Sequence, residues 1–197
     1  MNGMILKVIN ENLLLRRLIS PFLDKWVGKK VIRITDFLNK DGKILDLGCG
    51  NCYVANKLIE KAYDITPVDI RDLSVVENIT PIIFNGKKLP FANNTFETVL
   101  LLTVLHHSED PIELISESKR VAKYVVIIED TYKNNIQKFA VQFVDLIVNF
   151  GHSKMTYQNK KEEQWESIFN DIDLELLSKR RKSVLLFFQQ TTYHLGK

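Results

Sequence analysis

The sequence has few cysteines, no long hydrophobic run and little net charge, and each shortage excludes a class of protein. Two cysteines in 197 residues are too few for a disulfide-stabilised scaffold. No apolar run approaches the roughly 18 residues of a transmembrane helix, and the N-terminus lacks the continuous apolar core of a signal peptide. We therefore expect a cytoplasmic protein with no transmembrane segment. A net charge of +3 does not by itself indicate nucleic-acid binding.

What the sequence does contain is typical of one well-packed soluble domain. Hydrophobic residues make up 45% of the chain and charged residues 26%. A length of 197 residues leaves little room for a second domain with its own core. Positive charge gathers in two places: residues 1–45 hold nine basic and four acidic side chains, and residues 179–182 are all basic. Such clusters are most often solvated, but they leave an anionic partner such as RNA open.

The stretch from Lys43 to Val54 carries the main chemical signal. Its short apolar run at 44–47 is followed by Gly48 and Gly50, which predicts a buried strand that turns sharply into a helix. Glycines let a ligand approach the backbone closely, and the N–H groups at a helix start can bind it. Tyr53 stands where a dinucleotide fingerprint has its third glycine, which argues against a nicotinamide or flavin cofactor.

This stretch resembles the first motif of the class I S-adenosylmethionine-dependent methyltransferases, Asp/Glu-x-Gly-x-Gly. In that family a third glycine often follows where Cys52 stands, so this copy of the motif is incomplete. The resemblance implies that residues of the motif bind the cofactor, and the candidates are Asp46, Leu47, Gly48, Cys49 and Gly50.

The two cysteines, Cys49 and Cys52, have the Cys-x-x-Cys spacing that also occurs in redox and metal sites. Zinc would need two further ligands, for which His106 and His107 are the close-spaced candidates. Cysteine also packs as a small apolar residue in a tight turn. We favour this packing role and expect no metal.

A second strand, from Ile65 to Ile70, places an acid at the same edge of the predicted sheet. Asp69 follows Asp46 by 23 residues, close to the spacing at which an acid after the second strand meets a ribose in such folds. A carboxylate can accept hydrogen bonds from both ribose hydroxyls, and in the methyltransferases an acid at this place does so. We therefore predict that Asp69 and Ile70 contact the cofactor.

Residues 85–97 resemble a further methyltransferase segment, Gly-Asp-Ala-x-x-Leu-Pro-Phe-x-Asp-x-Ser-Phe-Asp, aligned through 89–91 and Phe96. In this alignment Asn85 replaces the aspartate that accepts the adenine amino hydrogen, and its side-chain oxygen can still accept one. Gly86 then lies beside the adenine ring. The resemblance therefore implies that Asn85 and Gly86 bind the base.

An apolar run from Thr98 to Val104 predicts a central parallel strand, buried on both faces, that ends just before His106 and His107. Sites in open α/β sheets lie beyond the carboxyl ends of the strands. The Leu-His-His-x-x-Asp-Pro sequence resembles a small-molecule, type-11-like subgroup of the same methyltransferases. A histidine there can act as a general base, or it can shape the pocket or cap the next helix. We keep Thr103 as a cofactor contact and both histidines as catalytic candidates.

The alternation of strands and helices predicts a single methyltransferase domain over residues 1–197. Its fold should be a Rossmann-like three-layer α/β sandwich of about seven strands, mostly parallel, with an antiparallel closing strand. We expect a helical lead-in at 1–42, a cofactor-binding half at 43–130, and substrate-side helices and closing strands at 131–197.

Three details of the outer segments follow from local patterns. Ser20 and Pro21 read as a cap and a first-turn proline, which divides the lead-in into two helices. Residues 134–150 form a broad apolar helix with one polar stripe. The last two strands, at 174–177 and 184–190, should be joined by a basic corner.

Together the motifs imply transfer of a methyl group from S-adenosylmethionine to an acceptor. No Asn/Asp-Pro-Pro-aromatic segment follows the fourth strand, which favours a small-molecule acceptor, and the apolar helix at 134–150 hints at a hydrophobic one. Two alternatives stay open: an RNA-directed methyltransferase or nucleic-acid-binding module that uses the basic clusters, and a cofactor-binding protein that no longer catalyses. Both a monomer and a homodimer are compatible with the sequence.

Overall fold

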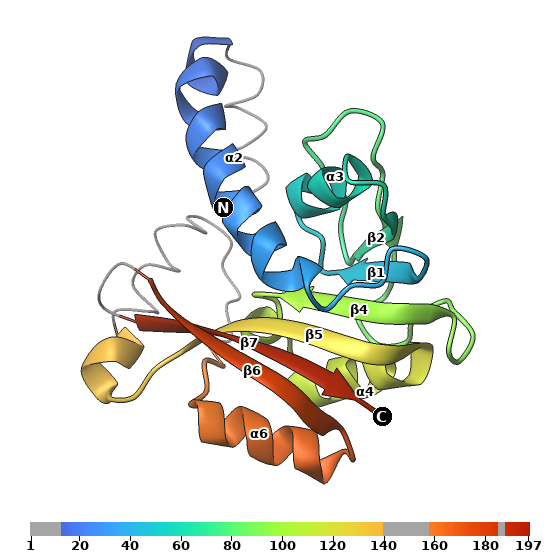
Figure 1. Cartoon of the computed structure of the whole chain (residues 1–197), viewed down its shortest axis with the longest axis vertical. Coiled ribbons are helices and arrows are strands. Elements are labelled where there is room, and N and C mark those ends of the chain that lie inside the picture. Colours follow the sequence, from blue (N-terminus) through green and yellow to red (C-terminus); the bar gives the residue numbers. More distant parts are fainter. Residues whose placement is uncertain (1–12, 140–157, 185–187) are drawn as a thin grey trace.

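One mixed sheet of seven strands runs through the computed structural model, which describes residues 13–139, 158–184 and 188–197 (Figure 1). The strands are Lys43–Leu47 (β1), Asp64–Asp69 (β2), Ile82–Ile83 (β3), Phe96–Leu102 (β4), Ala122–Thr131 (β5), Glu175–Val184 (β6) and Phe188–Gly196 (β7). Their order across the sheet is β3-β2-β1-β4-β5-β7-β6. Neighbours from β3 to β5 are parallel, and β7 runs antiparallel to both β5 and β6. The predicted α/β sheet with an antiparallel closing strand is confirmed.

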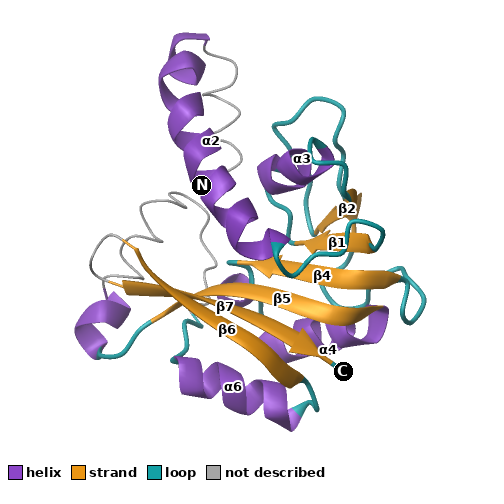
Figure 2. Ribbon diagram, viewed as in Figure 1, coloured by secondary structure: helices purple, strands orange, loops and turns teal. Residues whose placement is uncertain are grey.

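Helices cover both faces of this sheet (Figure 2). They are Leu13–Thr35 (α2), Tyr53–Ile59 (α3), Pro111–Val121 (α4) and Glu162–Asp171 (α6), with a short 3₁₀ turn at Leu105–His107 (η1). α2 and α3 pack on one face with Leu100 and Leu102 of β4, and α4 and α6 pack on the other face with Val99 and Leu101. Alternate residues of β4 thus enter opposite cores, as the two-residue period of a strand requires.

The predicted division of the N-terminal lead-in at Pro21 is wrong, because α2 continues without a break from Leu13 to Thr35. A proline inside a helix removes one backbone hydrogen bond and costs about 3 kcal/mol, but its fixed φ is helical, and α2 continues through it. Val27, Val31 and Ile34 of α2 are buried against the sheet. The C-terminal half of α2 therefore lies directly on the face that β1 and β4 share.

The C-terminal segment, residues 131–197, also differs from the prediction. Residues 179–182 lie inside β6 and form no corner, because the pairing of β6 with β7 continues from Glu175 to Val184. The predicted helix at 134–150 begins as a helix at 135–139, and the rest of it lies outside the described residues. Among the helices that the structure describes, none is long and apolar enough to cross a membrane.

Candidate cofactor site and active site

The strands β1, β2, β4 and β5 end at one edge of the sheet, and the glycine turn follows β1 there. The N–H groups of Gly48 and Cys49 both donate to the carbonyl of Val68 in β2, at 2.8 and 3.1 Å. Gly48 (φ 75°) and Gly50 (φ 53°) have left-handed backbone, which glycine adopts without strain. A Cβ on Gly48 would lie 2.6 Å from a methyl carbon of Val104, whereas a Cβ on Gly50 would meet no atom within 4 Å. Gly50 therefore borders open space that a ligand can occupy.

Asp69, the last residue of β2, holds this turn in place. Its Oδ2 accepts the Gly50 N–H at 2.8 Å. Its Oδ1 accepts the N–H groups of Ile70 and Arg71, at 2.7 and 3.3 Å. A carboxylate oxygen has two acceptor positions, so Oδ2 keeps one for a hydroxyl group of a ligand. The structure thus brings the predicted ribose acid next to the glycine turn.

Asp46 of β1 is buried and incompletely hydrogen-bonded. It is 2% exposed, and its Oδ2 has no hydrogen-bond partner among the described residues. Burial raises the pKa of Asp46 to about 7, although Lys30 acts in the opposite direction. A buried carboxylate oxygen without a donor is costly, and an ammonium group of a ligand would satisfy it. The side chain of Leu47 belongs to the core, so only the backbone of that residue faces the turn.

Thr103 and Lys30 meet beyond the end of β4. Thr103 has a left-handed backbone (φ 63°), and its N–H donates to the carbonyl of Ile128 at 2.7 Å. Lys30, on α2, is 4% exposed, and its Nζ donates to Thr103 Oγ1 at 2.9 Å. Lys30 belongs to no motif of the sequence and was not predicted as a site residue. Its spacing offered a signal, because it lies three residues after the buried Val27.

His106 and Glu129 form a buried pair at the ends of β4 and β5. Glu129 Oε2 lies 2.6 Å from His106 Nδ1, and Oε1 accepts the N–H groups of Val104 and Leu105 at 2.9 and 2.8 Å. One carboxylate thus shapes η1 and orients the imidazole. A carboxylate on Nδ1 favours the tautomer whose Nε2 can accept a proton. His107 is exposed, with its ring 4.0 Å from that of His106, so the two histidines differ in environment and His106 is the one that the buried carboxylate orients.

Asn85 and Gly86 lie in the loop after β3. Gly86 (φ 81°) approaches Ile70, because a Cβ on Gly86 would lie 3.5 Å from Ile70 Cγ2. The side chain of Ile70 is 52% exposed and offers an apolar surface for a flat ring. Asn85 Oδ1 accepts the N–H groups of Lys87 and Lys88 at 3.0 and 3.2 Å, so this oxygen already caps its own turn. Gly86 therefore lies next to Ile70, whereas the side-chain oxygen of Asn85 is hydrogen-bonded within its own loop.

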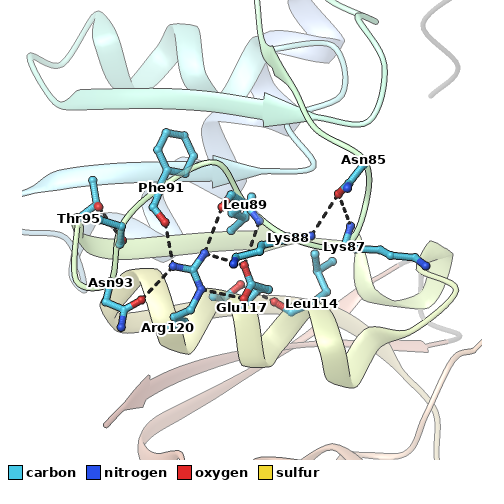
Figure 3. A network of polar contacts seen from close by, with 12 residues as sticks. Asn85, Lys87, Lys88, Leu89, Phe91, Asn93, Thr95, Leu114, Glu117 and Arg120 are labelled. Carbon is cyan, nitrogen blue, oxygen red and sulfur yellow. Dashed lines mark hydrogen bonds and ion pairs between the residues drawn. The ribbon is translucent and has the colours of Figure 1, made fainter.

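Arg120 of α4 holds the loop between β3 and β4 in place (Figure 3). Its guanidinium donates to the carbonyls of Leu89 and Phe91, at 3.1 and 2.8 Å. It also forms two hydrogen bonds of 2.8 Å with Glu117, whose carboxylate accepts the Leu89 N–H at 2.9 Å. The sequence analysis did not find this network, since no motif includes Arg120. It fixes the loop whose first residues, at Gly86, lie beside Ile70.

The cysteines of the glycine turn pack inside it. The sulfur atoms of Cys49 and Cys52 lie 3.6 Å apart, and both thiols are free and buried. Both side chains contact Ala55 of α3. Within the described ranges, no group of three or more His, Cys, Asp or Glu side chains is arranged to hold a metal ion.

The basic residues of β6 are mostly paired with acids. Arg180 forms an ion pair with Asp36 at 2.7 Å, and Glu162 pairs with Arg181 at 2.8 Å and with Lys179 at 3.4 Å. These acids offset the positive charge that the sequence shows at 179–182. The strand thus presents less free positive charge to a phosphate backbone than its sequence indicates.

A cavity of about 520 Å³ lies where β5 ends and β7 begins. This size is within the range of small-molecule pockets. Its described lining consists of polar and charged residues and one tyrosine, namely Thr131, Tyr132, Lys133, Lys161, Glu162, Glu163, Arg181 and Gln189. Thr131 directly follows Asp130, so the cavity begins next to the strand end that carries Glu129.

Residues 45–125, from β1 into β5, match the model of a family described as a methyltransferase domain. The match covers 81 of the 197 residues, so this part of the chain is similar to a methyltransferase domain. The cofactor of this family is S-adenosylmethionine, and the matched residues include the glycine turn, Asp69 and His106. The resemblance that the motifs indicate is thus confirmed.

Two curated relatives are about one-third identical to this chain over part of its length. A tRNA U34 carboxymethyltransferase from Campylobacter fetus is 33% identical over 95 residues, which cover 42% of this chain and 34% of the relative. An uncharacterised protein from Methanocaldococcus jannaschii is 34% identical over 83 residues, which cover 42% of this chain and 40% of the relative. The chain therefore matches less than half of the length of either relative.

Solved structures with the same fold cover nearly the whole chain. An S-adenosylmethionine-dependent methyltransferase from Methanosarcina mazei superposes with a TM-score of 0.67 at 19% identity, over 83% of this chain and 96% of that one. Magnesium protoporphyrin IX methyltransferase from Synechocystis, solved with bound S-adenosylhomocysteine, gives 0.64 at 15% identity, over 94% and 88%. At these identities the likeness shows a shared fold.

Proposed function

We propose that this protein binds S-adenosylmethionine and transfers its methyl group to a small-molecule acceptor. The observation that carries the proposal is the turn between β1 and α3. There Gly50 borders open space, and Asp69, which accepts the Gly50 N–H at 2.8 Å, keeps an oxygen position free for a ribose hydroxyl.

The residues at this edge fit the cofactor part by part. Asp69 accepts ribose hydroxyls, and the unpartnered Oδ2 of Asp46 accepts the ammonium of the amino-acid end. Ile70 and Gly86 form an apolar contact for the adenine ring. The backbone of the turn and the loop residues complete the set of proposed contacts, which are Leu47, Gly48, Cys49, Gly50, Asn85 and Thr103.

The cofactor supplies an electrophilic methyl group on a sulfonium sulfur. The protein holds the acceptor in line with it and excludes water. In this proposal His106, which is hydrogen-bonded to Glu129, takes a proton from a hydroxyl or amine acceptor. His107 is exposed, with its ring centroid 4.0 Å from that of His106, and it stays the second catalytic candidate. An acceptor that is already nucleophilic would need no base.

The cavity at the end of β5 is our candidate for the acceptor site. Its described lining is mostly polar and includes Lys133, Lys161 and Arg181. This favours a polar small molecule over the hydrophobic acceptor that the sequence at 134–150 indicates. A volume of about 520 Å³ suits a metabolite-sized acceptor.

Calorimetric titration of the purified protein with S-adenosylmethionine, and separately with NAD, tests the cofactor. We expect micromolar binding of S-adenosylmethionine alone. Binding of neither ligand, or of NAD, would overturn the proposal. Transfer of a labelled methyl group across a panel of small acceptors then tests catalysis, and tight cofactor binding without any transfer would favour a protein that no longer catalyses.

An RNA acceptor is the second candidate, since one relative is a tRNA U34 carboxymethyltransferase. Against it, three of the four basic residues at 179–182 are paired with acids. RNA binding that falls steeply as salt rises would support this candidate, because phosphate contacts release counterions. Weak binding with a flat salt dependence would exclude it.

A further inference from the structure

We infer that Lys30 binds the carboxylate of the cofactor's amino-acid end, so that α2 is part of the cofactor site. This inference rests on the proposed function and gives Lys30 a specificity-determining role. It concerns a residue that lies outside every motif of the sequence and outside residues 45–125, which match the methyltransferase domain.

Lys30 lies where α2 crosses the strand ends. Its Nζ donates to Oγ1 of Thr103, the first residue after β4. β1, which leads into the glycine turn, is the neighbour of β4 in the sheet. Lys30 is also close enough to Asp46 of β1 for each to shift the other's pKa. The Lys30 ammonium therefore lies at the same edge of the sheet as Gly50 and Asp69.

The hydrogen bonding of this ammonium is incomplete. An ammonium group carries three donors, and Thr103 Oγ1 is the one acceptor that reaches it among the described residues. Its other contact is the ring of Trp26, whose centroid lies 4.5 Å from Nζ. The two remaining donors can therefore serve a ligand.

The charge of Lys30 is buried and has no direct ion-pair partner among the described residues. Burial lowers the pKa of Lys30 to about 8, and Arg33 acts in the same direction. Asp130 and Glu129 of β5 and Asp46 of β1 raise it but do not restore the ordinary value. A buried cation that lacks a direct anionic partner is costly, and an anionic ligand group removes that cost.

The two side chains that contact the ammonium reach the surface. Trp26 is 43% exposed, and Thr103 is partly exposed. Lys30 itself is 4% exposed, so the inference requires that the ligand reach Nζ alongside these two side chains.

Lys30 and Asp46 together complement an α-amino acid. The cofactor's amino-acid end carries one ammonium and one carboxylate. Asp46 offers a buried, unpartnered oxygen, and Lys30 offers two unused donors. Binding of the zwitterion satisfies both groups at once, with the carboxylate beside Lys30 and the ammonium beside Asp46.

The test compares S-adenosylhomocysteine with its decarboxylated analogue, which lacks only the carboxylate. Calorimetric titration of the wild-type protein should give a preference for S-adenosylhomocysteine of at least about tenfold, the range of a hydrogen bond between charged groups. In Lys30→Met this preference should fall to roughly twofold or less, with the affinity for the decarboxylated analogue nearly unchanged. Lys29→Met, a change at the adjacent exposed lysine, should keep the wild-type preference.

Each other outcome overturns the inference. If Lys30→Met keeps the full preference, or if it weakens the binding of both ligands equally, the Lys30 side chain does not bind the carboxylate. Lys30→Gln, which keeps a donor toward Thr103, serves as a second variant if Met disturbs α2. Wild-type protein that binds neither ligand refutes the proposed function itself, and this failure is visible without any variant.

Discussion

Gly48 and Gly50 lie in one turn, but replacing each with alanine should damage different properties of the protein. Both residues have positive φ, 75° for Gly48 and 53° for Gly50. A Cβ on Gly48 would lie 2.6 and 2.7 Å from the two methyl carbons of Val104, whereas a Cβ on Gly50 would meet nothing within 4 Å. Gly48→Ala should therefore impair folding, and Gly50→Ala should impair cofactor binding.

The magnitudes follow from these two environments. Left-handed backbone costs a residue with a Cβ about 1–2 kcal/mol at either position. The contact with Val104 adds about 1–3 kcal/mol at Gly48 only, because a β-branched side chain cannot turn away. At roughly 2–4 °C per kcal/mol for a chain of this size, Gly48→Ala should lower Tm by roughly 4–20 °C and Gly50→Ala by roughly 2–8 °C. The methyl group at Gly50 projects into the ligand space and should weaken cofactor binding roughly 5- to 150-fold.

Thermal melts and calorimetric titration with S-adenosylhomocysteine separate the two effects. Val104→Ala in the Gly48→Ala background should recover part of the lost stability, since it removes the atoms that clash. Gly28→Ala is a matched control, because Gly28 lies in α2 with open space around it and ordinary helical backbone; it should raise Tm slightly. The reasoning is refuted if Gly50→Ala binds S-adenosylhomocysteine as tightly as the wild type, or if it loses more stability than Gly48→Ala.

Four further variants test the rest of the site. Asp69→Ala removes the acceptor of the Gly50 N–H, and calorimetry should show a loss of about 1.5–3 kcal/mol in affinity for S-adenosylhomocysteine. Glu129→Gln replaces a charged partner of three hydrogen bonds by a neutral amide, so thermal melts should show a loss of about 1–3 kcal/mol in stability. Arg120→Ala releases the carbonyls of the loop after β3 and should cost about 1–3 kcal/mol in stability, with cofactor affinity reduced much less. The pKa of Asp46 is about 7 in the folded protein, against an ordinary value of 3.8. Ionisation of Asp46 therefore lowers the stability of the wild type as pH rises from about 4 to 7. Thermal melts should show that Asp46→Asn is more stable than the wild type at pH 8, by up to ~4 kcal/mol, with little difference at pH 4.

Specific results would contradict these four expectations. Unchanged affinity in Asp69→Ala would remove the ribose contact from our site. A Glu129→Gln protein as stable as the exposed control Glu163→Gln would show that the pair with His106 is unimportant for folding. If Arg120→Ala were as stable as the wild type, the hydrogen bonds of Arg120 in Figure 3 would not contribute to stability. A Tm difference for Asp46→Asn that does not change with pH would mean that Asp46 ionises normally.

The sequence predicts those parts of the fold where local pattern and tertiary pairing agree. The continuous apolar run at 98–104 and the two glycines after Leu47 define β1, β4 and the turn, because both faces of these strands are buried. β6 was not predicted along its length, since residues 178–183 are all polar and show no apolar alternation. Its backbone pairs with β7 as the outermost strand, where charged side chains suit an exposed edge.

In the candidate site, too, the sequence predicts the residues of local motifs and not those that depend on tertiary packing. Asp46, Gly50 and Asp69 belong to spaced motifs, so the sequence alone names them. Lys30 belongs to no motif, and a lysine on a helix is normally solvated; only the packing of α2 across the strand ends buries it. Glu129 was visible as a strand-end acid, but its partnership with His106 depends on β4 and β5 being neighbours, which no local pattern states.

The buried charges at the strand ends explain why this edge of the sheet suits a zwitterionic ligand. Burial moves the pKa of Asp46 up and that of Lys30 down, so the surroundings of each group disfavour its charged form. Leu45 and Leu100, equally buried in the neighbouring strands, carry no such cost. If the cofactor places an opposite charge beside each group, as we propose, its binding removes a cost that folding imposes. On this proposal, cofactor affinity and cofactor-induced stabilisation share one physical source, and filling the site recovers the stability lost at Asp46 and Lys30 in the free protein.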